Sequence, residues 1–305
     1  METLSAFDKR FPDEDACRAA LRDARWPDGV TCPKCGGKEK VYALKSKPFY
    51  WLCKPCGNHR FSVIGDTIFD NTKKPLLIWF KVAYLMLVAK KGRSALEIHR
   101  TIYGDPFTAD YHTTWYMCTR LRAAMRNKEW SALMGEVEVD ETYIGGKDRN
   151  RHWIKKSAQQ RKIKGPQPLG GAIGYGKVGV IGAIERKGNV VCKVIGDASA
   201  ETLSRFVRAA VSEKVDLVAT DENPAYDYVR AGMPHGKVKH SAGEYVRGNV
   251  HTNNIESFWS LLKRGVVGTF HKVSKPYLPL YLAEFTFRHN NRGNPDMFME
   301  LLSRC

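Results

Sequence analysis

The most regular alternation of apolar and polar positions lies in the stretch Glu136–Gly146. Val137 and Val139 alternate there with acidic residues, and this period of two predicts a β-strand that a glycine pair ends. The acids are Glu136, Glu138 and Asp140. Because like charges on one strand face repel, two interpretations stay open: the solvated face of an edge strand, or a face whose oxygens bind a divalent cation.

Further strand and helix patterns follow this stretch. Strands are expected at Val178–Glu185 and Asn189–Ile195, and Ser199 can cap a helix that runs to about residue 213. The apolar strand Val215–Thr220 then delivers Asp221 at its C-terminal end. Three strands, a helix and a further strand predict an α/β fold of the ribonuclease H-like type, a mixed sheet flanked by helices. Ligands gather at strand ends in such sheets.

An amphipathic helix is predicted over Asn249–Arg264, with Thr252 or Asn253 as its N-cap. Its apolar stripe consists of Ile255, Phe258, Trp259 and Leu262. Glu256 and Lys263 share another face, because they lie seven positions, about two helical turns, apart.

Helix patterns also dominate the N-terminal part of the chain. Helices are expected over Phe11–Arg25 and Thr72–Lys91, and the apolar run of the second is too short for a membrane span. A helix opened by Ser94 and another over Thr108–Met125 indicate a helix-turn-helix-like region. The side chains that would face DNA are Thr113, Thr114, Arg120 and Arg122. A packed helix pair without DNA contact is the alternative interpretation.

Composition narrows the class of partner. The 305 residues are enough for two or three domains, and the net charge of +17 favours a polyanion such as nucleic acid, although solubility explains part of such a charge. The basic stretch Lys147–Gln167 is interpreted either as a solvated loop or as a segment that follows phosphates. The N-terminus carries acids and no apolar signal region, so we expect an intracellular protein without membrane contact.

The cysteine spacing predicts a zinc ribbon. Cys32 and Cys35 form one Cys-x-x-Cys pair, and Cys53 and Cys56 form a second pair seventeen residues later. Four thiolates suit a tetrahedral, structural zinc ion with no position left for water. Two redox pairs, the alternative, would need a strand–helix setting that is missing here. The four remaining cysteines are expected to be unpaired thiols; they are Cys17, Cys118, Cys192 and Cys305.

Taken together, these motifs resemble the bacterial insertion-sequence transposases that join an N-terminal zinc ribbon to a ribonuclease H-like DDE core. The resemblance covers nearly the whole chain. It rests on the segments Val139–Lys147, Thr220–Asp221, His251–Arg264 and Phe287–Arg292, and on Trp26–Gly29 before the first cysteine pair.

The resemblance implies a catalytic set and its metal. Asp140, Asp221 and Glu256 would bind two Mg²⁺ or Mn²⁺ ions, with Asp140 shared between them, for DNA cleavage and joining of the released 3′-OH to target DNA. Lys263 and Arg264 would lie near transposon-end DNA. The neighbouring acids are interpreted as surface charges or as charges behind the ligands, and Glu222 as pointing elsewhere; these neighbours are Glu136, Glu138 and Glu141.

We therefore expect three domains: residues 1–70 with the zinc ribbon, residues 71–130 as the helical DNA-binding region, and residues 131–305 as the catalytic domain. Joining two DNA ends in one event implies a homodimer or larger assembly, acting in the bacterial cytoplasm at the nucleoid. A catalytically inactive zinc-ribbon DNA-binding protein is the main alternative. A zinc-dependent hydrolase is disfavoured, because four cysteines leave the zinc no open position.

Overall fold

The computed structural model describes residues 2–104, 110–127, 131–145, 177–228 and 232–305. The basic stretch Lys147–Gln167 and the expected helix start at Thr108 lie outside these residues. The chain divides into two compact units, residues 127–290 and residues 1–126 together with 291–305. The expected division into three domains stays a prediction, and each unit is described by itself.

The unit of residues 127–290 is built on a five-stranded mixed sheet. Its strands, in chain order, are β4 (Glu136–Ile144), β5 (Val178–Glu185), β6 (Val190–Ile195), β7 (Leu217–Thr220) and β8 (His235–Lys237). The spatial order is β6-β5-β4-β7-β8, with β4, β5 and β6 antiparallel and with β7 and β8 parallel to β4 and to each other. The expected ribonuclease H-like mixed sheet is confirmed. Because β4 is the central strand, its interpretation as an edge strand is wrong.

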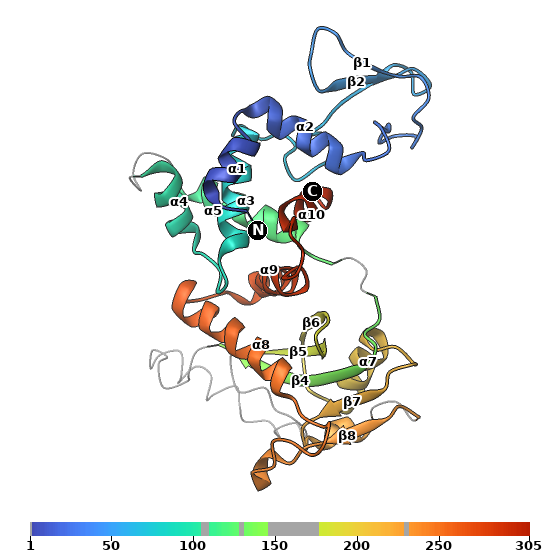
Figure 1. The fold of residues 1–305 in the computed structure, drawn as a ribbon, viewed down its shortest axis with the longest axis vertical. Coiled ribbons are helices and arrows are strands. Elements are labelled where there is room, and N and C mark those ends of the chain that lie inside the picture. The colour runs from blue at the N-terminus through green and yellow to red at the C-terminus, as the bar shows by residue number, and fades with distance from the viewer. Residues whose placement is uncertain (1, 105–109, 128–130, 146–176, 229–231) are drawn as a thin grey trace, which may run out of the picture. The chain divides into compact units, whose positions relative to one another are not determined.

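Helices cover both faces of this sheet (Figure 1). On one face, α7 (Ala200–Ala210) packs against Val137 and Val139 in a shared core. On the other face, α8 (Asn253–Arg264) and α9 (Leu278–Asn290) pack against Ile144 and β5. The alternation of side chains along β4 therefore serves two cores.

The helices α7 and α8 of this unit begin with different kinds of N-cap. Ser199 accepts a hydrogen bond from the Thr202 N–H at 3.3 Å, as predicted, although α7 ends at Ala210 rather than near residue 213. Thr252 precedes α8, but its side chain accepts no capping bond. Short helical turns complete the unit: η2 (Pro224–Tyr228), η3 (His240–Ala242), η4 (Gly265–Thr269) and η5 (Lys275–Tyr277).

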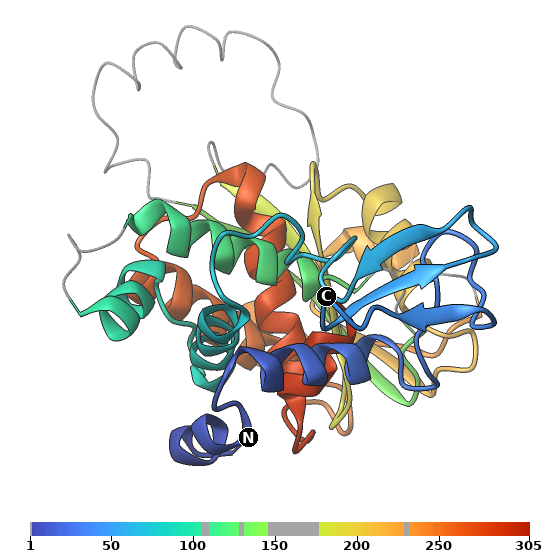
Figure 2. The same ribbon diagram turned by 90° about the horizontal axis from the view of Figure 1, so that it is seen from above.

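The other unit contains a three-stranded antiparallel sheet, visible in blue in Figure 2. Its strands are β1 (Val41–Ala43), β2 (Tyr50–Cys53) and β3 (His59–Ser62). The first two form a hairpin, and β3 follows the second cysteine pair. The helices are α1 (Leu4–Arg10), α2 (Glu14–Arg25), α3 (Leu76–Val88), α4 (Ala95–Tyr103), α5 (Tyr111–Ala124) and α10 (Met297–Ser303).

Aromatic packing joins both ends of the chain within this unit. Phe7 lies 4.5 Å from Tyr84 of α3 and 5.0 Å from Phe298 of α10, measured between ring centroids. Phe80 lies 5.1 Å from Phe298. Such edge-to-face and tilted pairs add to the free energy of area burial. The C-terminal helix thus packs with the N-terminal helices.

Helix α3 is the buried helix that its apolar run predicted. Nine of its thirteen residues are buried. Thirteen residues rise about 20 Å, short of the roughly 30 Å of a bilayer core. In the described ranges, no helix combines the length and the apolarity needed to cross a membrane.

Gly182 allows α8 to lie close to the sheet. It pairs with Asp140 across β4 and β5, and a Cβ atom added there would lie 2.6 Å from Cη2 of Trp259. Trp259 is a rigid side chain only 3% exposed, so it has little room to move.

We predict that Gly182→Ala destabilises the protein by about 1–3 kcal/mol, the usual cost of overpacking a core. Thermal unfolding measures the change. Gly196→Ala is the matched control, because an added Cβ there meets no atom within 4 Å. Equal melting temperatures for the two variants would contradict this account of the α8 contact.

Candidate zinc site and active site

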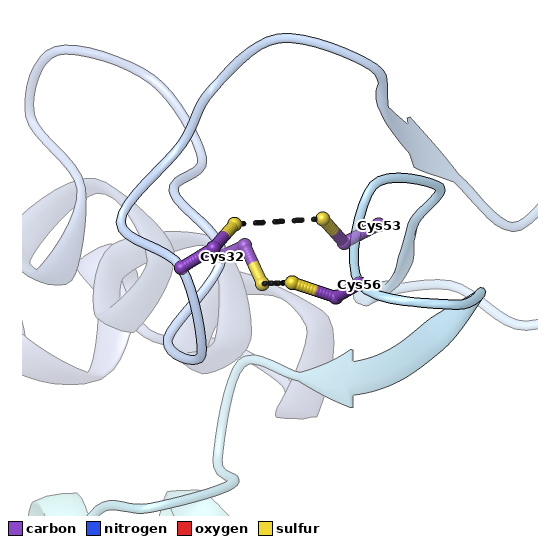
Figure 3. Close-up of side chains that lie close together, drawn as sticks. Cys32, Cys53 and Cys56 are labelled. Atoms are coloured by element: carbon purple, nitrogen blue, oxygen red, sulfur yellow. Dashed lines mark hydrogen bonds between the residues drawn. The ribbon is translucent and has the colours of Figure 1, made fainter.

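The four ribbon cysteines converge on one point (Figure 3). Their sulfur atoms all lie within 4.8 Å of one another, with Cys32 Sγ 4.0 Å from Cys56 Sγ and Cys35 Sγ 3.8 Å from Cys53 Sγ. A tetrahedron with Zn–S bonds of about 2.3 Å has edges of about 3.8 Å. The spacing therefore fits a structural zinc ion, and the structure brings the four predicted ligands together.

The turns after each cysteine pair explain part of this geometry. Gly36 and Gly57, which follow Cys35 and Cys56, have φ angles of 69° and 67°. Glycine reaches this left-handed region without steric cost. The other four cysteines lie in the described ranges and form no disulfide bond, as predicted, and burial raises the pKa of Cys17 to about 12, which suits an inert thiol.

We predict about one zinc ion per chain, and its loss in Cys53→Ser. Metal analysis after extensive dialysis measures the content, and thermal unfolding reports the lost stability, because metal binding of this kind is coupled to folding. Cys305→Ser, outside the ribbon, is the control and should keep its zinc. A Cys53→Ser protein with full zinc content would contradict the assignment.

Three acids approach one another in the unit of residues 127–290. Asp140 lies on the central strand β4, Asp221 directly follows β7, and Glu256 lies in the first turn of α8. Burial first, and then the charges of Glu141 and Asp221, raise the pKa of Asp140 to about 8, with a smaller contribution from Glu256. The three predicted ligands thus lie within electrostatic reach of one another.

The cluster is wider than the coordination shell of one small ion. Among the described residues, the four cysteines are the group of three or more potential metal ligands whose ligand atoms lie within 4.8 Å of one another. The three carboxylates do not form a group that tight. The arrangement is therefore unlike the closed zinc site in the ribbon.

A pocket of about 370 Å³ opens beside Asp140. One part of its wall is acidic and another is basic. Its lining consists of Asp140, Glu141, Thr142, Glu256, Trp259, Ser260, Lys263 and Arg264. The predicted pair Lys263 and Arg264 thus shares a pocket with two of the predicted metal ligands, because one face of α8 carries Glu256 and Lys263 together.

Glu138 is the most heavily bonded acid of β4. It is fully buried, and its Oε2 accepts hydrogen bonds from the N–H groups of Asn254 at 2.8 Å and Ile255 at 3.1 Å. Its Oε1 accepts from Asn254 Nδ2 at 2.7 Å and from Arg186 Nε at 2.9 Å. Of the two interpretations of Glu138, a surface charge or a charge behind the ligands, its burial excludes the first: its carboxylate joins β4 to the start of α8.

Glu141 makes the corresponding connection to the loop after β7. Its carboxylate accepts hydrogen bonds from the Tyr226 hydroxyl and from Asn223 Nδ2, the latter at 2.7 Å. The Asn223 N–H in turn donates to Asp221 Oδ1 at 3.1 Å. Glu141 is therefore partly buried and holds the loop that carries Asp221. Glu222 points elsewhere, as predicted, and accepts hydrogen bonds from Ser241.

Two of the side chains predicted to face DNA from the helix pair α4–α5 are buried. Arg122 is 1% exposed and Thr114 is fully buried, so their predicted exposure to DNA is wrong. Both lie on the face of α5 that packs inside its unit. Arg120 remains partly exposed and donates to the Tyr116 hydroxyl at 2.7 Å.

Sequence reasoning missed most of the contacts around the three acids. They are made by Glu138, Arg186, Asn223, Tyr226 and Thr252, of which Glu138 was predicted only as a charge either at the surface or behind the ligands. One signal was available for Glu138, because a period of two places it on the same strand face as Asp140. Arg186, Asn223 and Tyr226 lie 48, 82 and 85 residues from the glutamates that they bond, so nothing local marks them. Thr252 lies only four residues from Glu256, but it was predicted as an N-cap.

Comparison with known proteins agrees with this architecture. Residues 132–290 match the family described as ISXO2-like transposase domain, and residues 12–59 match the family described as transposase zinc-ribbon domain. Over 286 residues, 92% of each chain, the protein is 28% identical to an uncharacterized protein in transposable element ISH50 of Halobacterium salinarum.

A ribonuclease H-like domain with acids at two strands and a helix, accompanied by a zinc ribbon, is the architecture of a transposase. The chain belongs to the ISXO2-like transposase family. The resemblance noted from the motifs is thereby confirmed.

Proposed function

We propose that this transposase cleaves DNA at the ends of its insertion sequence and joins the 3′-OH to target DNA. The observation that carries the proposal is the convergence of Asp140, Asp221 and Glu256 beside a pocket that also contains Lys263 and Arg264. Oxygen ligands on one side and cations on the other suit a metal-dependent reaction at a phosphate.

The donor set fits Mg²⁺ or Mn²⁺. All three side chains offer carboxylate oxygens, which these hard cations prefer. Two such ions, held by these carboxylates, would stabilise charge on the attacking and leaving oxygens of an in-line displacement. The width of the cluster suits more than one ion. The raised pKa of Asp140 agrees with this setting, since burial first, and then the neighbouring charges of Glu141 and Asp221, disfavour its ionised form.

The cationic side chains of the pocket have a separate role. Lys263 and Arg264 would bind backbone phosphates and hold the DNA strand against the acids, with Lys263 on the same helix face as Glu256. Further contacts would come from Arg120 and from the zinc ribbon, whose basic side chains include Lys38, Lys40, Lys45, Lys47, Lys54 and Arg60. We further propose a homodimer or larger assembly, because two DNA ends must be joined in one event, and action at the bacterial nucleoid in the cytoplasm.

Strand transfer on a labelled DNA end tests this proposal. The substrate is DNA that flanks the coding sequence of the element, incubated with Mg²⁺ or Mn²⁺. We expect Asp140→Asn, Asp221→Asn and Glu256→Gln to lower the rate on the order of a thousandfold, as when a main stabiliser of transition-state charge is removed. DNA affinity should be kept.

Glu222→Gln is the matched control, because Glu222 neighbours Asp221 but bonds to Ser241. It should transfer strands at the normal rate. Full activity in the Asp221→Asn protein would refute the proposal. DNA binding without any strand transfer by the native protein would instead favour the inactive DNA-binding alternative.

A further inference from the structure

The N-terminus of α8 is capped by a side chain from another element. The first N–H groups of a helix lack partners, and an N-cap Ser, Thr, Asp or Asn usually accepts from the second or third of them. Helices α1, α2, α4, α5, α7 and α10 each use their own N-cap residue in this way. In α8 the same two N–H groups, those of Asn254 and Ile255, donate to Glu138 of β4.

This exchange leaves the hydroxyl of the N-cap residue available. Thr252 is 1% exposed, and its Oγ1 donates to Oε1 of Glu256 at 2.7 Å. A hydrogen bond to a carboxylate is stronger than one between neutral groups. The bond therefore restrains the Glu256 side chain, which otherwise has three rotatable bonds at the edge of the pocket.

Glu138 is itself fixed from several directions. Arg186, beside it, donates to Glu138 and also to the carbonyl oxygen of Asn249 at 2.6 Å, in the segment that leads into α8. Nδ1 of His251 lies 3.1 Å from Glu138 Oε1. A buried carboxylate with this many partners is costly to lose, because removing it leaves buried donors unsatisfied.

We infer that Glu138 and Thr252 are positioning residues for Glu256: Glu138 caps α8 from the strand that carries Asp140, and this frees the Thr252 hydroxyl to hold the Glu256 carboxylate. Without Glu138, the Thr252 hydroxyl would serve as the cap of α8 and would release Glu256. The inference rests on the proposed function, in which Glu256 is a metal ligand.

Mn²⁺ affinity and single-turnover strand transfer test this inference. Thr252→Val removes the hydroxyl but no cap bond, so we expect a 10- to 100-fold weaker Mn²⁺ affinity, the scale of loss when a group behind a metal ligand is removed. The rate of strand transfer at subsaturating Mn²⁺ should fall in parallel, with unchanged DNA affinity. Thr252→Ser keeps the hydroxyl and should restore both values.

A double-mutant cycle separates positioning from general stability. Glu138→Gln should weaken Mn²⁺ binding to a similar extent, and Glu138→Gln with Thr252→Val should be little worse than either alone, because both act on one hydrogen bond. Glu136→Gln is the control: Glu136 also bonds Arg186 but reaches no N–H group of α8. It should bind Mn²⁺ normally.

Native Mn²⁺ affinity in Thr252→Val, or fully additive losses in the double variant, would overturn the inference. If Glu138→Gln does not fold, the comparison of Thr252→Val with Thr252→Ser still tests the inference, because neither substitution removes a hydrogen bond between Glu138 and α8. Failure of the proposed function would look different: Glu256→Gln itself would then leave Mn²⁺ affinity unchanged.

Discussion

The hydrogen bonds from the start of α8 to the buried carboxylate of Glu138 are the interaction on which the candidate active site depends. A metal-dependent site needs ligands from separate elements held at fixed separations. Glu138 lies two residues from Asp140 on one face of β4, and it binds the helix that carries Glu256. Strand and helix are therefore joined two residues from Asp140 and at the two residues that precede Glu256, and Gly182 lets Trp259 of the same helix lie close to the sheet.

The other side of β4 makes the second connection. Glu141 points away from Glu138, because successive strand residues alternate in direction, and it binds Tyr226 and Asn223 after β7. Asn223 also donates to Asp221. One strand thus supplies Asp140 and the contacts that hold both other acids. The acidic sequence of β4 is explained by this arrangement: each charge has a separate structural task, and repulsion within the strand is offset by donors from three elements.

Much of this architecture could be predicted from local patterns. The alternation in β4 and β5, the spacing of the cysteines and the apolar stripe of α8 each depend on residues close in sequence, so the sheet, the ribbon and the helices were predictable. The partners of Glu138 and Glu141 lie between 48 and 117 residues away along the chain. Local patterns carry no information on such pairs. The prediction that Arg122 faces DNA was wrong for a related reason. A charged residue in a helix was expected to be exposed, whereas tertiary packing buries it.

The account holds that Asp140, Asp221 and Glu256 form one site for two divalent cations. Counting Mn²⁺ ions bound per chain, by equilibrium binding with the ribbon zinc in place and element-end DNA present, tests this claim most directly. The account predicts two ions in the native protein and a loss of binding in Asp140→Asn. Unchanged binding in Asp140→Asn, or none in the native protein on its DNA, would contradict it.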